Sequence, residues 1–150
     1  MSSRVMVLLS AVLALACGEA LGPGDIAGTY ALQRVAGDPL PAVLYTTQTV
    51  VVRVFADTLR FTADRRGIST TVRESEPVTG GPATEPRRGE TGFSFRVADG
   101  RIEVAFDCPI NANCVAPPHL VLKRTDAGLR ADFALVARTP LLYARVAPTR

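Results

Sequence analysis

Apolar and polar residues alternate along most of the chain beyond residue 26. The alternation, or a β-branched run that opens it, covers residues 49–55, 59–63, 68–73, 93–97, 102–106, 120–123 and 129–135. Neighbouring side chains of a strand point to opposite faces, whereas an amphipathic helix repeats every 3.6 residues. No window beyond residue 26 shows a helical stripe. The pattern therefore predicts an all-β domain whose strands each bury one face.

Short glycine-containing turns separate these segments. Asp64-Arg65-Arg66-Gly67, Ala98-Asp99-Gly100 and Asp126-Ala127-Gly128 each place a glycine where a hairpin requires a positive φ. Strands joined by such turns are antiparallel neighbours. We expect an antiparallel up-and-down meander of eight or nine strands that closes into a small barrel, since closure removes exposed edges. A two-sheet sandwich is the alternative architecture.

The alternation also predicts which side chains face the interior. The expected inward set is apolar: Leu59, Phe61, Ile68, Val72, Phe93, Phe95, Val97, Ile102, Val104, Phe106, Leu120, Leu122, Leu129, Phe133 and Leu135. The expected outward set is charged: Arg60, Arg73, Arg96, Glu103, Lys123, Arg130 and Asp132. The segment from Pro77 to Glu90 breaks the pattern and reads as a long mobile loop between two strands, either a binding arm or a solvated insertion.

Val5 to Ala16 form a short apolar stretch behind the positive charge of Arg4. The stretch is too short to span a bilayer, so residues 1–16 are predicted to be a secretory signal peptide. Leu13-Ala14-Leu15-Ala16-Cys17 resembles the lipobox of bacterial lipoproteins, which implies acylation of Cys17 as the new N-terminus. Residues 17–25 would then be a lipidated, flexible tether, and residues 26–150 the barrel domain.

Three cysteines make an odd count, which an exported protein must accommodate. Lipidation of Cys17 leaves Cys108 and Cys114 as an even pair, and we expect them to form a disulfide in an oxidising compartment. A metal site that adds His119 is the alternative, but these three ligands match no familiar zinc spacing. We therefore predict neither a bound metal nor a cofactor.

Charge and motifs argue against several function classes. Without residues 1–16 the formal net charge falls from +3 to +2, which is too weak to suggest nucleic acid as a partner. His119 is the sole histidine, and the chain has no Gly-x-Ser-x-Gly elbow. Glu74 and Glu76 share a strand face and are expected to be solvated, balanced by Arg73 or by Arg87 and Arg88. We predict no catalytic residue and no enzyme activity.

The stretch Ile26-Ala27-Gly28-Thr29-Tyr30 and the later Gly37-Asp38-Pro39-Leu40-Pro41 resemble the opening of lipocalin-like domains in small bacterial lipoproteins. Residues 141–146 resemble the closing strand of those domains, which pairs with the first. In this arrangement Tyr30 would plug one barrel end with its hydroxyl near water.

The resemblance and the signal together predict a lipoprotein anchored in the cell envelope. It would face the periplasm with the bilayer as its partner, and the resemblance to enterobacterial lipoproteins, with Gly18 and no aspartate after Cys17, favours the outer membrane over the inner one. The barrel would bind a small apolar ligand through interior aromatic residues: Tyr30, Phe61, Phe93, Phe95, Phe106 and Phe133. The alternative is a structural or interaction protein whose barrel is filled by its own side chains.

Overall fold

Ten strands form one antiparallel sheet in the computed structural model, which describes residues 22–108, 119–132 and 140–148. One helical turn, α1 (Pro23–Ile26), precedes them. The strands are β1 (Gly28–Val35), β2 (Asp38–Pro39), β3 (Ala42–Thr46), β4 (Val50–Phe61), β5 (Arg66–Pro77), β6 (Arg87–Ala98), β7 (Arg101–Phe106), β8 (His119–Thr125), β9 (Gly128–Ala131) and β10 (Leu141–Arg145).

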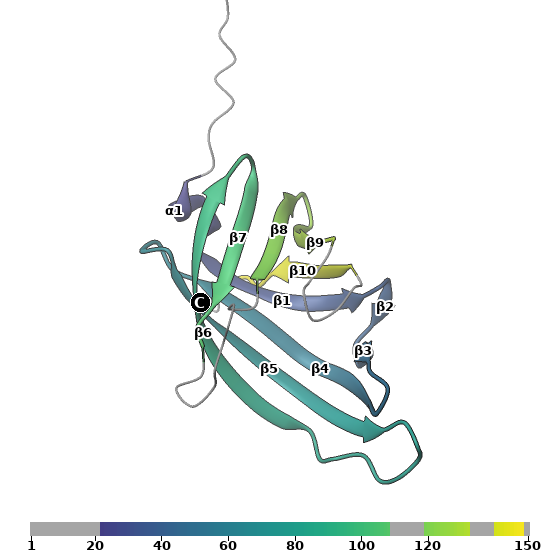
Figure 1. Cartoon of the computed structure of the whole chain (residues 1–150). Helices are drawn as coiled ribbons and strands as arrows, with labels where there is room; N and C mark the ends of the chain where they lie inside the picture. Colours follow the sequence, from purple (N-terminus) through teal and green to yellow (C-terminus); the bar gives the residue numbers. More distant parts are fainter. Residues whose placement is uncertain (1–21, 109–118, 133–139, 149–150) are drawn as a thin grey trace, which may run out of the picture.

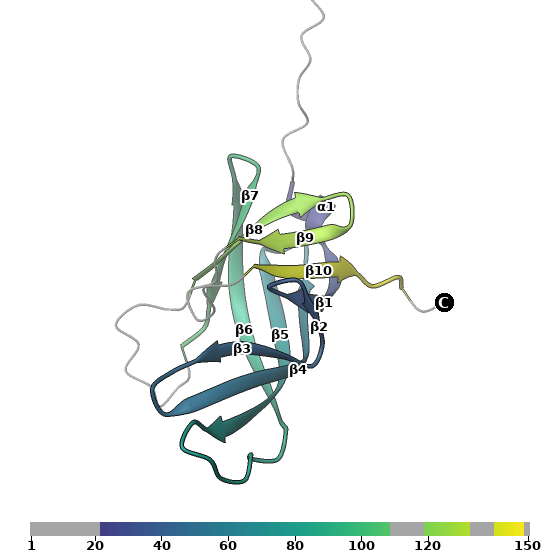
Figure 2. The same cartoon turned by 90° about the vertical axis from the view of Figure 1, so that its right-hand side faces the viewer.

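The sheet closes on itself through β1 (Figures 1 and 2). One edge of β1 pairs with β10, and its first residues pair with the end of β4, Gly28 opposite Phe61. Strands β1 and β4 to β10 thus form an eight-stranded barrel, with β2 and β3 added beside β1 and β4. The predicted up-and-down barrel is confirmed, and so is the return of the last strand to the first. The sandwich alternative is wrong.

The turn α1 lies at one end of the barrel and contributes to its core. Ile26 is 1% exposed, and its carbonyl accepts a hydrogen bond of 3.1 Å from the Tyr30 hydroxyl. Residues 23–25 belong to this helical turn, whereas the sequence indicated a flexible tether there. The expectation that the Tyr30 hydroxyl meets water is also wrong, because a buried hydroxyl needs a protein partner and Ile26 supplies it.

Most of the predicted inward residues do fill the barrel. Those that are buried are Leu59, Phe61, Phe93, Phe95, Ile102, Val104, Leu120, Leu122 and Leu129. Val97 and Phe106 pack partly buried against them. Phe133 and Leu135 lie outside the described residues. Of the predicted outward set, Arg60, Arg96, Lys123, Arg130 and Asp132 are exposed, and Glu103 is half-buried beside Arg96.

Strand β5 presents the opposite face from the one predicted. Leu59 and Phe61 point inward, and their partners across the β4–β5 ladder are Ser69 and Gly67. Directly opposed residues of antiparallel strands share a face, so the odd-numbered positions of β5 point inward. Ile68, which is 37% exposed, and Val72 therefore lie on the outer face. Arg73 lies on the inner face, contrary to the prediction.

The expected loop from Pro77 to Glu90 is shorter than the sequence suggested. Pro77 ends β5, and Arg87 to Glu90 belong to β6, paired with Arg73 to Thr70 of β5. These four residues carry no apolar signal, and backbone pairing alone makes them strand. Residues 78–86 form the connection.

Gly67 is needed for packing and not for a positive φ. The positive φ of the β4–β5 turn is taken by Arg65, at 66°, whereas the predicted turn glycines Gly100 and Gly128 do have positive φ. A Cβ on Gly67 would overlap the Phe93 ring and approach the Arg60 carbonyl oxygen. The bare glycine therefore lets Phe93 lie across β5.

Replacing Gly67 by alanine should destabilise the protein by about 1–3 kcal/mol, because the added methyl displaces Phe93 from a filled core. Gly89→Ala is the matched control, since its Cβ would meet only the Thr71 hydroxyl at 3.8 Å. That control should stay within about 0.5 kcal/mol of the wild type. Urea unfolding of both variants measures the difference, and equal midpoints would contradict this account of Gly67.

Candidate functional site

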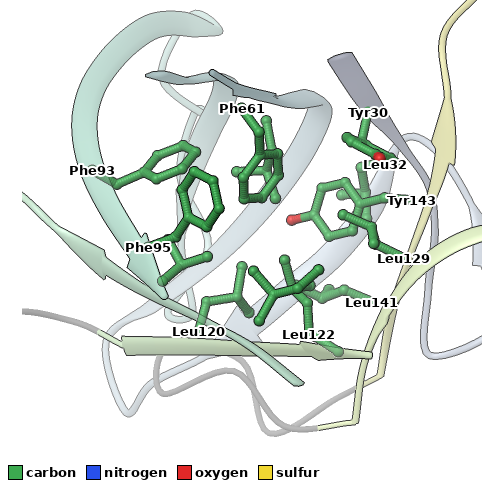
Figure 3. Close-up of a cluster of buried hydrophobic side chains, with 14 of the residues drawn as sticks. Tyr30, Leu32, Phe61, Phe93, Phe95, Leu120, Leu122, Leu129, Leu141 and Tyr143 are labelled. Atoms are coloured by element: carbon green, nitrogen blue, oxygen red, sulfur yellow. The ribbon is translucent and has the colours of Figure 1, made fainter. Parts of the chain in front are cut away.

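The predicted ligand-binding aromatic residues pack on one another. The Phe61 ring lies edge-on to Tyr30, Phe93 and Phe95, with centroid separations of 5.7, 5.1 and 5.0 Å. Phe93 makes a further edge contact with Phe106 at 5.8 Å. Figure 3 shows Phe61, Phe93 and Phe95 grouped on one side of the interior. These four phenylalanines and Tyr30 form one apolar wall; Phe133 lies outside the described residues.

Few residues of this aromatic wall line the surface hollows. Hollows lined by described residues have volumes of about 230 to 310 Å³ and include Tyr30 in one case and Phe95 in another. The hollow at Phe95 also touches His119 and Ser94. His119 is exposed at the first position of β8, and the described part of the chain offers it no hydrogen bond to a serine or carboxylate.

A polar group occupies the barrel interior beside the aromatic wall. The Tyr143 hydroxyl donates a 2.9 Å hydrogen bond to Oδ2 of Asp57, and the Ser69 hydroxyl lies 3.5 Å from Oδ1. Tyr143 is 1% exposed, and in Figure 3 its hydroxyl points into the interior. The three residues come from β10, β4 and β5, so closure of the barrel brings them together.

Burial raises the pKa of Asp57 from 3.8 to about 6, because the interior disfavours the charged carboxylate. The hydrogen bond from Tyr143, the charge of Arg73 and the bond from Ser69 oppose this rise. Burial and the neighbouring carboxylate also raise the pKa of Tyr143 well above its usual value of 10. Tyr143 thus stays a hydrogen-bond donor at any ordinary pH.

The far halves of three strands continue past the aromatic wall. We call residues 50–57 of β4, 70–77 of β5 and 87–92 of β6 the β4–β6 extension. Within the described residues, positions 87–91 of β6 pair with β5 alone, because the pairing with β7 begins at Phe93 and Gly92 accepts a backbone hydrogen bond from Asp107. Figure 1 shows the extension running beyond the short strands of the opposite wall.

Two arginines occupy the inner face of the β4–β6 extension. Arg73 lies opposite the buried Val54 in one ladder and opposite Arg87 in the other. The Nε atom of Arg73 is buried and has no hydrogen-bond partner. In the described part of the chain neither arginine forms an ion pair within 4 Å.

The carboxylates expected to balance these arginines lie on the other face. Glu74 and Glu76 are within 3.7 and 3.4 Å of the Arg53 guanidinium, on the outer side of the β4–β6 extension. The predicted balance by Arg73, Arg87 or Arg88 is therefore wrong, because Arg73 and Arg87 point inward and Arg88 pairs with Glu90. Arg53 supplies the outer positive charge.

Several predicted sites lie at the margins of the described residues. Cys17 and Cys114 are outside them, while Cys108 follows β7 by two residues. Among the described residues, no three histidine, cysteine or acidic side chains gather as metal ligands would. No helix in those same ranges is long and apolar enough to cross a bilayer.

Comparisons with protein-family models, with curated proteins and with solved structures found no match to this chain. The fold and the interior polar group are therefore the observations from which a function can be argued.

Asp57→Asn should flatten the pH dependence of stability between about pH 4 and pH 6. In the wild type the unfolded Asp57 ionises near pH 4 and the folded one near pH 6. Stability from this group is therefore present at low pH and falls by about 3 kcal/mol as pH rises through that window. Urea unfolding from pH 4 to pH 7.5 measures both slopes.

Asp132→Asn is the control of opposite sign. Hydrogen bonding to Lys123 holds the pKa of this exposed carboxyl below its usual value. The stability that the ionised Asp132 contributes is lost as pH falls, so Asp132→Asn should lower the free energy of unfolding mainly above pH 4. Identical slopes for the wild type and Asp57→Asn would show that Asp57 does not ionise as a buried group.

Proposed function

We propose that this chain is a membrane-anchored lipoprotein whose lipocalin-like barrel binds a small apolar ligand. The barrel would act as a binding module of the cell envelope, facing the periplasm, with Cys17 acylated. The proposal rests on the lipobox-like segment of the sequence and on an eight-stranded barrel, a size that admits one small molecule.

One observation carries the ligand part of the proposal. On the inner face of the β4–β6 extension, Thr71 of β5 and Thr91 of β6 remain accessible next to the apolar aromatic wall, whereas Val52 and Val54 of β4 are buried. A small apolar molecule placed there would cover Thr71 and Thr91 and lie beside the barrel interior. Ligand sites combine such apolar walls with a few polar groups, as Asp57, Ser69 and Tyr143 provide.

The second candidate is a non-catalytic structural or interaction protein of the envelope. The edge-to-face packing of Phe61 against three other rings favours it, because side chains in such contact leave little interior space between them. The two candidates differ in one measurable property, which is saturable binding of an apolar molecule.

Two covalent features belong to the same proposal. Acylation of Cys17 by two or three chains would give a stable anchor, since each buried methylene contributes about 0.8 kcal/mol. A Cys108–Cys114 disulfide would close the segment after β7, and a ring of this size stabilises by about 2.4 kcal/mol in the chain-entropy model.

Apolar binding can be tested with the neutral fluorescent probe N-phenyl-1-naphthylamine. Saturable 1:1 binding with increased emission is expected, and Thr71→Trp should weaken it at least tenfold, because Thr71 faces inward opposite Asp57. Thr70→Trp is the matched control, since the neighbouring position faces outward; its affinity should stay within twofold. Absence of saturable binding to the wild type would favour the structural alternative.

Cys17→Ser should release the protein from the membrane. The substitution removes the thiol that the acyl chains would modify, so the protein should move from the membrane pellet to the soluble fraction on ultracentrifugation. It should also lose sensitivity of its processing to globomycin. The double variant Cys108→Ser with Cys114→Ser is the control for loss of the other cysteines and should stay in the pellet. Unchanged partitioning of Cys17→Ser would defeat the anchor.

A further inference from the structure

A surface hollow lies at the end of the barrel that α1 occupies. It has a volume of about 310 Å³ and is lined by residues 124–128 around the β8–β9 turn, by Tyr30 of β1 and by Arg145 of β10. The Arg145 guanidinium connects the hollow to α1, because it donates a 2.8 Å hydrogen bond to the Ala27 carbonyl. Figures 1 and 2 both draw α1 and the β8–β9 turn at the upper end of the molecule, opposite the β4–β6 extension.

Two arginines reach this hollow from inner-face positions at the ends of their strands. Arg124, the last residue but one of β8, lies opposite the buried Leu129. Arg145, the last residue of β10, lies opposite the buried Tyr30. Opposed residues share a face, so each arginine follows the core at the end of its strand. Both are exposed, since a long side chain can cover apolar groups with its stem and hold its guanidinium in the solvent.

The positive charges of the two arginines are not balanced by ion pairs. Among the described residues, neither Arg124 nor Arg145 forms one, although Asp126 lines the same hollow. The Arg145 guanidinium is held over the Tyr30 ring, 5.9 Å from the ring centroid, so its position is fixed in advance. Thr125 of the same lining has a buried hydroxyl without a hydrogen-bond partner in the described part of the chain. The hollow thus presents donors and two positive charges against one negative charge.

A phosphate group matches these donors better than a carboxylate does. Its oxygens point in several directions, so two guanidiniums on different strands can each bind a pair of them. A carboxylate has two oxygens, which the fork of a single guanidinium already satisfies. The volume of about 310 Å³ lies at the lower end of the range for ligand pockets, which suits a small phosphate ester.

We propose that the hollow beside α1 binds the phosphate group of a small ester through Arg124 and Arg145. The inference goes beyond the proposed function, because it concerns a hollow at the surface of one barrel end and not the interior. The phosphate group belongs either to a soluble ester or to a phospholipid headgroup. An acylated Cys17 would bring headgroups close to this end, since the described chain begins at Gly22 directly before α1.

The test has two arms, and every protein in it is the full chain with Cys17→Ser, so that no acyl chain binds lipid. The first arm is an NMR titration with glycerol 3-phosphate at pH 7.5 and low salt. Saturable binding with a Kd of about 1 mM is expected, whereas glycerol should not bind. The second arm is co-sedimentation with vesicles of phosphatidylcholine mixed with phosphatidylglycerol. Vesicles of phosphatidylcholine alone are the reference for contact through residues 1–16.

Arg124→Gln should weaken phosphate binding at least about fivefold, because it removes one of the two guanidiniums. The variant should fold normally, since the Arg124 side chain makes no hydrogen bond or ion pair with the described residues. Asp126→Asn should instead tighten binding about threefold, because it removes the carboxylate of the lining. Arg87→Gln is the matched control: it removes the same charge from an exposed position of the β4–β6 extension and should stay within twofold.

A loss of binding in Arg124→Gln that Arg87→Gln does not share would support the phosphate site. Saturable binding of glycerol 3-phosphate would assign it to soluble esters, and binding to phosphatidylglycerol vesicles alone would assign it to headgroups. Equal losses in the two variants would overturn the site, because net charge would then explain them, and so would the absence of binding in both arms. Binding of N-phenyl-1-naphthylamine should be unchanged in Arg124→Gln, so failure of the phosphate site is distinguishable from failure of the proposed function.

Discussion

Residues that oppose each other in an antiparallel ladder must lie on the same face of the sheet, and this constraint determines the interior of the barrel. Leu59 and Phe61 are held inside by the aromatic wall, so their partners Ser69 and Gly67 are inside as well. Because side chains alternate along a strand, every second residue of β5 beyond Ser69 also faces the interior. The polar side chains of Thr71 and Arg73 therefore face inward whatever their own hydropathy, and the apolar side chains between them face solvent.

A β-bulge in β4 determines which acidic side chain faces the interior beside Thr71 and Arg73. The β4–β5 register shifts between Val54 and Ala56, so Phe55 is the extra residue and is 37% exposed. Before the bulge the even-numbered positions point inward, and after it the odd-numbered ones do. Asp57 is thereby turned into the interior, where burial raises its pKa to about 6. The free energy lost on burying this carboxyl is partly offset by the Tyr143 hydroxyl.

The sequence predicted most of the strands because a period of two survives in them, and it predicted closure because an open sheet would leave edges exposed. It predicted the wrong face of β5, because Ile68 and Val72 are the apolar positions of that alternation, yet the register with β4 turns them outward. Only the partner strand distinguishes the two phases. Arg87 to Glu90 were not predicted to be strand for another reason. They join β6 through backbone pairing and include no apolar residue. The Asp57–Tyr143 contact joins residues 86 positions apart and depends on the bulge, so no local pattern could indicate it.

The two ends of the barrel differ in a way that bears on how an anchored protein would meet its ligand. The described chain enters at α1, and Ile26 and Tyr30 fill that end. The β4–β6 extension lies at the opposite end (Figure 1). The five residue-to-residue steps from Cys17 to Gly22 reach at most about 18 Å, so an acylated Cys17 would hold the filled end near the bilayer. The β4–β6 extension would then face away from the lipid surface, and a ligand bound there would arrive from the aqueous side and not by direct transfer from the membrane.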